Sequence, residues 1–494
     1  MNIRTLDFTS GVRRFWLLTI LCAALYIPGI SVLPPIDRDE ARFMQSTKQM
    51  IESGDYGRIR FQAEPRDKKP VGAHWVQAAA VNAFSAQDIF QTWPYRLPSA
   101  LGAWLAVMST AWAATRLLGP ATGFAAGAIL ATSVLVIAEA HLAKADALLL
   151  GASAAVMGGL LQAYSTKKMS AAGTIIFWAS LGAGVLIKGP ILLGVVALAV
   201  ITLGAADKSL AWLAQLNPKP GVWIALGIVA IWPLTAGLDE VLRYARAAAS
   251  QDLWPKVING VESHGAPPGT HLAATVLTLW PWVWALPVSA LSAWQKRTDR
   301  SVRFCIAWIV PFWLVLELVP TKLPHYVLPL FPAIAVLIAI ALTSKRNWQV
   351  TRFVGVGIGG LILLSSIMAA LTIVLADKLP SWRELNLSKS LAAAIHRHDS
   401  DADNVILIGY HEPSAVFLLG TDATLTNPQN AAALMTSSPN AIAAVDRRDV
   451  AELEMYLARS GQKIVSLENI SGYNYSRGEP LTLVVVKAIP SPDP

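Results

Sequence analysis

Charged side chains are scarce in this sequence, and cysteines are nearly absent. Only 15% of the 494 residues are charged, whereas 54% are hydrophobic, and the mean hydropathy is +0.47. This composition indicates an integral membrane protein. The two cysteines, Cys22 and Cys305, both fall in apolar stretches. A framework of disulfides is therefore excluded as the basis of the fold.

Long apolar stretches run from about Phe15 to Ala376, and short polar loops separate them. Each stretch is near the ~20 residues that an α-helix needs to cross a bilayer, and none alternates as a β-barrel strand would. The expected fold is an α-helical polytopic membrane protein of about 11–13 transmembrane helices. The first span has no cleavage site after it, so we expect a retained helix and not a removed signal peptide. The predicted spans are Phe15–Leu33, Leu97–Leu118, Gly123–Ala138, Leu148–Tyr164, Gly173–Ile187, Ile191–Ala205, Val222–Leu238, Leu272–Leu291, Phe304–Leu318, Val327–Leu342 and Phe353–Leu375.

Basic residues gather in alternate short loops and so predict the orientation. The positive-inside rule makes the loops that carry them cytoplasmic. They are Arg4, Arg13, Arg14, Lys167, Lys168, Lys296, Arg297, Arg300, Arg303, Lys345, Arg346 and Arg352. The opposite, outer side then holds the loop 34–96, the segment 139–146 and everything after Asp377. The net charge of +8 and pI of about 9.4 partly reflect this inner bias, so we expect no nucleic-acid partner.

The composition changes after Leu375. Three short apolar runs, at Asn404–Gly409, Ala441–Asp446 and Leu481–Val486, read as buried strands, and helical patterns lie between them. We therefore expect two domains, a transmembrane domain over 1–376 and a small α/β domain over 377–494. The small domain has no glycine-rich phosphate loop and no Cys/His metal spacing, and we interpret it as a stabilising or substrate-covering cap.

One polar loop follows the first span and carries unusual charge. It contains Asp39-Glu40-Ala41-Arg42-Phe43 and, about thirty residues later, Lys68-Lys69-Pro70. A helix is expected from Asp37 to Ser53, ended by Gly54, with Asp37 and Glu40 in the spacing of a capping box. First-turn acids complement a helix dipole, and interfacial lysines often snorkel, so these residues alone permit a purely structural interpretation.

Several motifs occur in a fixed order along the chain. They are Asp39-Glu40-Ala41-Arg42-Phe43, Ser53-Gly54-Asp55-Tyr56, Lys69-Pro70-Val71-Gly72-Ala73-His74-Trp75, Lys144-Ala145-Asp146, Leu186-Ile187-Lys188-Gly189-Pro190 and Lys322-Leu323-Pro324-His325-Tyr326. In these segments the chain resembles the bacterial aminoarabinose transferase and protein O-mannosyltransferase superfamily of GT-C glycosyltransferases. Members are multi-span enzymes that move a sugar from a polyprenyl phosphate to an acceptor outside the cytoplasmic membrane. The C-terminal domain carries little of the likeness.

The resemblance implies roles for the acidic residues. Asp39 matches the catalytic carboxylate of the family, which would accept the proton of the acceptor hydroxyl or orient that group. Asp146 matches a second loop aspartate that would orient the acceptor or the sugar, although it could also cap the next span. Glu40 and Arg42 would support Asp39, because Arg42 lies about one helical turn away.

The resemblance also implies a set of cations around the donor phosphate. Lys69 matches the family lysine that stabilises the leaving lipid phosphate. The other candidates for substrate contact are Lys68, Lys188, His264, Lys322, His325 and Tyr326. Each lysine could instead be an interfacial anchor, and Tyr326 could belong to an aromatic belt.

The sequence departs from the family pattern in two places. Lys68 stands where several relatives have an acid before the Lys-Pro pair, and His264 lacks the basic residue expected after it. Both changes put a shared metal in doubt, so we expect no metal and no cofactor.

The expected function is transfer of a sugar from a polyprenyl-phosphate-linked donor to a lipid, glycan or protein acceptor. The site and the C-terminal domain are expected on the periplasmic side of the inner membrane. Two alternatives remain, a membrane transporter and a non-catalytic envelope-assembly protein. A transporter should carry ionisable residues deep in its spans, whereas these spans are nearly free of charge. An assembly protein would not explain acids and lysines gathered on one side.

Overall fold

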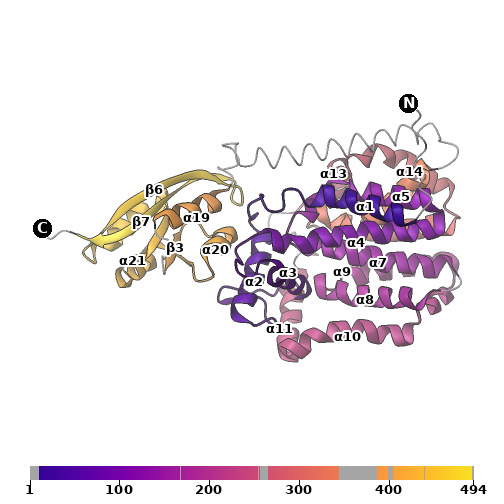
Figure 1. Cartoon of the computed structure of the whole chain (residues 1–494), viewed down its shortest axis with the longest axis horizontal. Coiled ribbons are helices and arrows are strands. Elements are labelled where there is room, and N and C mark those ends of the chain that lie inside the picture. Colours follow the sequence, from indigo (N-terminus) through magenta and orange to yellow (C-terminus); the bar gives the residue numbers. More distant parts are fainter. Residues whose placement is uncertain are drawn as a thin grey trace.

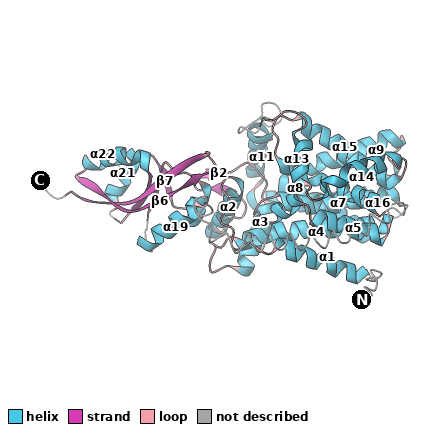
Figure 2. Cartoon of the chain, turned by 90° about the horizontal axis from the view of Figure 1, so that it is seen from above, coloured by secondary structure: helices cyan, strands magenta, loops and turns pink. Residues whose placement is uncertain are grey.

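A bundle of helices and a smaller α/β domain at one end of it make up the molecule (Figure 1, Figure 2). The computed structural model describes residues 11–166, 169–253, 255, 265–343, 386–398, 404–438 and 440–491. The bundle contains α1 (Gly11–Tyr26), α2 (Asp39–Ser53), α3 (Gly72–Phe84), α4 (Trp93–Leu118), α5 (Pro120–Ala131), α6 (Val134–Ala140), α7 (Asp146–Ser165), α8 (Ala171–Lys188), α9 (Ile191–Asp207), η1 (Ala211–Leu216), α10 (Pro218–Ala236), α11 (Leu238–Ala247), η2 (Ala248–Leu253), α13 (Thr270–Thr278), η3 (Trp282–Ala285), α14 (Leu286–Gln295), α15 (Arg300–Leu318), η4 (Pro324–Leu330) and α16 (Phe331–Leu342). A two-residue hairpin, β1 (Arg60–Phe61) and β2 (Glu64–Pro65), lies between α2 and α3.

Ten of the predicted spans fall on helices of the described chain, which confirms a helical polytopic membrane fold. Within the described residues, six helices are long and apolar enough to cross a membrane. The first predicted span was too long, because α1 ends at Tyr26 and the chain then turns at Pro28 and Gly29, where φ is 94°. The eleventh span, Phe353–Leu375, and the domain boundary at 376/377 lie outside the described residues.

Two predicted spans are bent and do not form single straight helices. The helix axis bends by 62° between α5 and α6, where the backbone of Ser133 is extended. The helix axis bends by 119° between α13 and the following η3–α14 segment. Pro281 lies at this second break and has no N–H to continue a helix. Composition alone could not reveal these bends, because the flanking residues are apolar on both sides.

Glycine allows helices to approach closely at two places that shape the site. A Cβ on Gly102 of α4 would lie 2.6 Å from the carbonyl oxygen of Ala147, next to the start of α7. A Cβ on Gly72 would lie 2.7 Å from the carbonyl oxygen of Leu186 in α8. Small residues permit such backbone contact between membrane helices. The start of α3 is thereby held against the end of α8.

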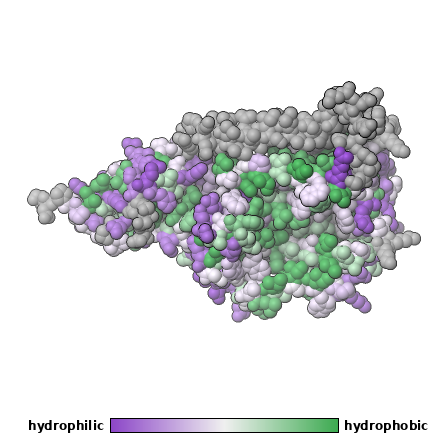
Figure 3. Space-filling view, in the orientation of Figure 1, coloured by the Kyte–Doolittle hydropathy of each residue, from purple (hydrophilic) through white to green (hydrophobic). Residues whose placement is uncertain are grey.

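Apolar side chains cover much of the bundle, and polar ones gather on the α/β domain (Figure 3). On α10, Trp223 is 73% exposed and Leu234 is 83% exposed. An apolar surface of this kind suits hydrocarbon better than water, in agreement with a bundle that spans a membrane.

The C-terminal domain is a five-stranded mixed sheet with helices on both faces, as the sequence predicts for an α/β domain. The strand order is β4-β3-β5-β7-β6. Strands β4, β3 and β5 are parallel, whereas β7 and β6 are antiparallel to their neighbours. The elements are α19 (Leu387–His398), β3 (Val405–Ile408), α20 (Pro413–Leu419), β4 (Thr424–Thr426), α21 (Pro428–Ser437), β5 (Ile442–Asp446), η6 (Arg447–Asp449), α22 (Val450–Ala458), β6 (Gln462–Asn474) and β7 (Glu479–Pro490).

Helix α20 joins the C-terminal domain to α2 of the loop 34–96 (Figure 1). The Asp37 carboxylate accepts the N–H of Ser414 at the start of α20, at 2.9 Å. Near the other end, the buried Lys48 ammonium donates to the carbonyl of Phe417 at 3.0 Å. An anion at the N-terminus and a cation at the C-terminus both complement the dipole of α20. The predicted capping box is therefore wrong, because no side chain caps α2 and Asp37 caps a helix of the other domain.

Asp37 should make the stability of this junction depend on pH. Burial raises the pKa of Asp37 to about 6. A carboxyl group with a raised pKa in the folded state stabilises that state fully below its unfolded pKa of about 4, and this contribution is lost as pH rises through about 6. We expect Asp37→Asn to abolish the fall in melting temperature over this interval, measured on the purified protein in detergent.

The helix cap itself gives the control for this variant. Asn caps helices about as well as Asp, so near neutral pH Asp37→Asn should melt at or slightly above the parent temperature. Asp37→Ala should instead lose about 1 kcal/mol of unfolding free energy. Parallel pH profiles for the parent and Asp37→Asn would contradict this account of the junction.

Candidate active site

A buried ion pair between Glu40 and Arg96 fixes the segments around the candidate site. Arg96 is fully buried and donates to both carboxylate oxygens of Glu40, at 2.8 and 3.0 Å. Its guanidinium also donates to three carbonyls of the irregular segment 30–34. The Glu40 carboxylate further accepts the backbone N–H of Ala143 at 2.7 Å. The pair thus ties the start of α2 to the segment that precedes Asp146. The supporting role of Glu40 in the reaction stays a prediction.

Asp39 begins α2 and presents its carboxylate to solvent, with 55% of the side chain exposed. Its Oδ1 atom lies 3.9 Å from the guanidinium of Arg66, which is buried. Partial loss of hydration would raise the pKa of Asp39, but the charges of Arg66, Lys144 and Lys69 outweigh it and lower the pKa. The negative charge of Asp146 is near enough to oppose them. Asp39 is therefore an ionised carboxylate at neutral pH that a substrate could reach.

A second acid, Asp146, is the centre of a buried ionic cluster. The Lys188 ammonium donates to its Oδ1 atom, and Lys144 lies 3.8 Å from Oδ2. Lys144 also donates to Glu139 at 3.0 Å. The two ring nitrogens of His325 lie 3.9 Å from Glu139 and 3.8 Å from Asp146. Two lysines thus balance two carboxylates near the start of α7, and the His325 ring lies beside both acids.

The remaining predicted residues lie around this cluster with different partners. The Lys188 ammonium is 6.0 Å from the centre of the Tyr326 ring, which places Tyr326 beside the cluster. Lys322 is buried and donates to the carbonyl of Val319 at 2.5 Å, just after α15 ends. Lys322 therefore pairs with a carbonyl at a helix end. Its contact with substrate stays a prediction.

Four further residues were predicted to contact or support the substrate, and their roles stay predictions. Lys69 is half-buried near Asp39, whereas Lys68 is exposed. Arg42 is half-buried, and its support of Asp39 stays a prediction. His264 lies outside the described residues. Across the part of the chain that the structure describes, no group of three or more His, Cys, Asp or Glu side chains is arranged to hold a metal ion.

Four residues that complete the candidate site were not predicted from the sequence. Arg66, Arg96, Glu139 and Lys144 all make ion pairs within it. Lys144 and Glu139 stand in the segment that holds the Asp146 motif, so their closeness to Asp146 was a usable signal. Arg66 and Arg96 gave none, because their partners belong to other elements of the chain.

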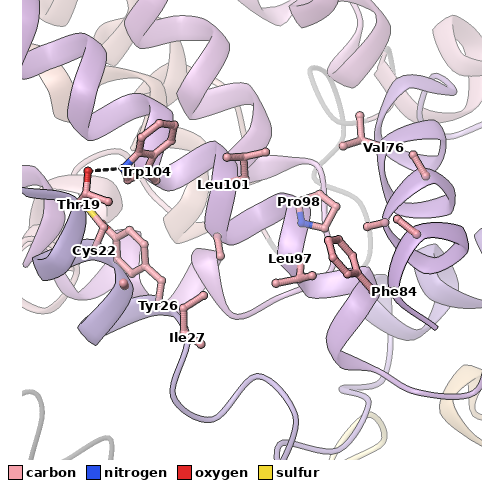
Figure 4. A pocket seen from close by; sticks show the side chains of 15 residues that line it. Thr19, Cys22, Tyr26, Ile27, Val76, Phe84, Leu97, Pro98, Leu101 and Trp104 are labelled. Atoms are coloured by element: carbon pink, nitrogen blue, oxygen red, sulfur yellow. Dashed lines mark hydrogen bonds between the residues drawn. The ribbon is translucent and has the colours of Figure 1, made fainter. Parts of the chain in front are cut away.

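An apolar cavity of about 620 Å³ lies between α1, α3 and α4 (Figure 4). Tyr26, Val76, Phe84 and Leu101 line it, and Trp104 donates to Thr19 across one side at 3.1 Å. A lining of this kind suits a hydrocarbon chain and not a sugar or phosphate. The charged cluster, not this cavity, is therefore the candidate site for chemistry.

No protein-family model matches this chain. Among curated proteins, it is 27% identical over 390 residues to an undecaprenyl phosphate-alpha-4-amino-4-deoxy-L-arabinose arabinosyl transferase of Edwardsiella ictaluri, covering 74% of this chain and 66% of that protein. It is 24% identical over 369 residues to the protein of the same name from Aeromonas salmonicida, covering 71% of this chain and 64% of that protein. The chain thus matches slightly less than two thirds of the length of these relatives.

Solved structures share the fold. ArnT from Cupriavidus metallidurans bound to undecaprenyl phosphate superposes with a TM-score of 0.71 at 16% identity, over 96% of this chain and 98% of that chain. The oligosaccharyltransferase AglB from Archaeoglobus fulgidus gives a TM-score of 0.54 at 12% identity, over 88% of this chain and 69% of that chain. This chain is therefore a multi-pass membrane protein with the GT-C glycosyltransferase fold, related to the bacterial aminoarabinose transferases.

Proposed function

We propose that this protein is a glycosyltransferase that moves a sugar from an undecaprenyl-phosphate-type donor to an envelope acceptor. The observation that carries the proposal is the exposed, ionised Asp39 beside a group of lysines at the end of an apolar bundle. Membrane anchoring of the donor requires its phosphate to react near the bilayer surface, where these charges lie. The relatives named as undecaprenyl-phosphate-dependent transferases support the same class of donor.

In the proposed reaction, the acceptor hydroxyl attacks the anomeric carbon of the donor sugar. A new carbon–oxygen bond forms, the bond between the anomeric carbon and the lipid phosphate breaks with its electron pair leaving on the phosphate, and the hydroxyl proton passes to the Asp39 carboxylate. Asp39 orients the hydroxyl and stabilises the positive charge that develops on it. Because its neighbours lower the pKa of Asp39, the carboxylate is a weak base, so proton transfer should come late in the reaction.

The lysines supply the other half of the proposed chemistry. Lys69 is the proposed partner of the departing phosphate, because it lies near Asp39 and is half-buried. Asp146 already pairs with Lys188 and Lys144, so we assign it to fixing these cations as well as to orienting substrate. Lipid, glycan and protein acceptors all present a hydroxyl that this arrangement could use.

We also propose that the site faces the periplasm. Asp146 begins α7, whereas Tyr164 lies near the end of α7 and contacts Arg300 and Asp207. Asp207 in turn pairs with Arg303. The basic residues of the α14–α15 connection are thus about 30 Å from Asp146 along α7. Their charge supports a cytoplasmic position for that end of the bundle and a periplasmic position for the site.

A reporter fused to the C-terminus should test this orientation. The C-terminal domain contacts α2, so it must share the side of the site. We expect a phosphatase that is active only in the periplasm to give signal after fusion to residue 494. Signal from a cytoplasm-only reporter at the same position would overturn the orientation.

Substitution of the two aspartates should separate chemistry from stability. Asp39→Asn should lower transfer roughly 10²-fold or more, because an amide presents no negative charge to the acceptor. Its melting temperature should fall less than that of Asp146→Asn, because Asp39 is 55% exposed and only one buried cation, Arg66, loses its carboxylate partner. Asp146→Asn should lower both transfer and melting temperature, because it leaves buried lysines without their carboxylate. Transfer is measured with polyprenyl phosphosugar and the purified variants.

Asp55→Asn is the matched control for this comparison. Asp55 follows the same helix, and its exposed ion pair with Arg58 lies outside the site. This variant should transfer sugar at the parent rate. A parent-like rate for Asp39→Asn would disprove the proposed role of Asp39, and absence of transfer by the parent itself would favour a transporter or an assembly protein.

A further inference from the structure

Arg66 contacts two residues that occupy one face of α2. Asp39 and Phe43 are four positions apart, so their side chains project on the same side of the helix. One guanidinium nitrogen of Arg66 lies 3.9 Å from the Asp39 carboxylate. The guanidinium carbon also lies 5.0 Å from the centre of the Phe43 ring. A planar guanidinium can use its face for the ring and its edge for the carboxylate, which a lysine cannot do.

A buried column of side chains continues from Arg66 into the bundle. The Phe43 ring stacks on His74 of α3, with centres 4.9 Å apart and planes inclined by 20°. His74 is fully buried, and its Nδ1 atom is 2.8 Å from the hydroxyl of Thr47. That hydroxyl donates to Gln77 at 2.8 Å. Arg66 is therefore held against a surface that α2 and α3 build together.

The backbone fixes Arg66 from its other side. Its N–H donates to the carbonyl of Ile59 at 2.8 Å, and the β1–β2 hairpin lies between these two residues. Only 7% of Arg66 is exposed, although it belongs to a loop at the polar end of the bundle. Burial of a charged side chain is costly unless a partner compensates, and here Asp39 and the Phe43 ring do so.

We propose that Arg66 is a positioning residue for the transfer reaction, which fixes the Asp39 carboxylate in the orientation that meets the acceptor hydroxyl. The proposal rests on the function proposed above. Arg66 touches neither substrate nor the reacting atoms in this assignment. It acts through Asp39, and the Phe43–His74 column holds it in place.

The charges around Asp39 determine what loss of Arg66 should do. The groups that face Asp39 are Arg66 and Lys69 from the loop, Lys144 from the segment before α7, Asp146 at the start of α7, and His325 from η4. The charge of Arg66 does most to lower the pKa of Asp39, so its removal should raise the pH at which Asp39 loses its proton. An adjacent opposite charge typically changes such a titration by about 1–3 pH units.

The test compares Arg66→Met, Arg66→Lys and Phe43→Leu in transfer assays across a range of pH. Arg66→Met should lower kcat about 10- to 100-fold and move the acidic limb of the rate profile to higher pH by about 1 unit or more. Arg66→Lys and Phe43→Leu keep the charge, so they should lower kcat and leave that limb within about 0.3 units of the parent. Arg58→Met, which alters an exposed loop arginine paired with Asp55, should match the parent in both quantities.

A titration without substrate separates this proposal from the proposed function. The Asp39 carboxyl is followed by the infrared difference between each protein and its Asp39→Asn counterpart. Its midpoint should rise in the Arg66→Met background by about 1 pH unit or more, even if no transfer activity is found. The proposal would be overturned if Arg66→Met left the titration midpoint of Asp39 unchanged and kept kcat within twofold of the parent value. A lower melting temperature with parent-like kcat per folded molecule would also overturn it, since that result describes a residue that only stabilises the fold.

Discussion

The buried contact between Glu40 and Arg96 is the interaction on which the arrangement of the site depends. Arg96 satisfies carbonyls of the irregular segment 30–34 and both oxygens of Glu40, while Glu40 also holds the N–H of Ala143. Four parts of the chain therefore meet at one ion pair: the exit of α1, the start of α2, the start of α4 and the segment before α7. Loss of one partner would leave the other charge buried and uncompensated, which costs several kcal/mol in proteins. This contact fixes the position of Asp39 relative to Asp146, because it joins the segments that carry them.

The C-terminal domain stabilises the same region from the other side. Arg38 immediately precedes Asp39 and has φ 70° and ψ −114°, a conformation that non-glycine residues rarely adopt. The preceding residue, Asp37, caps α20. The guanidinium of Arg38 donates to the carbonyl of Ser476 at 2.8 Å. The turn that presents Asp39 is thus held between the two domains. A domain that binds α2 in this way can position the helix that carries Asp39, which goes beyond the covering role that composition suggested.

The sequence predicted the helices, strands and helix ends that depend on neighbouring residues. The apolar stretches predicted the helices, Gly54 predicted the end of α2, and the short apolar runs predicted β3, β5 and β7, because hydrophobic periodicity and special backbone conformations are visible in neighbouring residues. Contacts between residues far apart in the sequence could not be predicted. Asp37 and Ser414 are 377 positions apart, and no property of either segment indicates that they meet. Arg66 and Arg96 likewise looked like ordinary loop and span-end cations. The apolar composition gave no sign of the bend between α5 and α6, whereas Pro281 was a local signal for the break after α13.

We propose that the charged cluster at the end of this bundle transfers a sugar from a lipid phosphate to an envelope molecule. Mass spectrometry of envelope lipids and glycans tests it most directly, on cells that lack this protein and on cells in which the parent protein is restored. We expect an envelope component to lose the mass of one sugar residue when the protein is absent and to regain it on restoration. Identical envelope spectra in the two strains, under conditions in which the protein is produced and folded, would contradict the account.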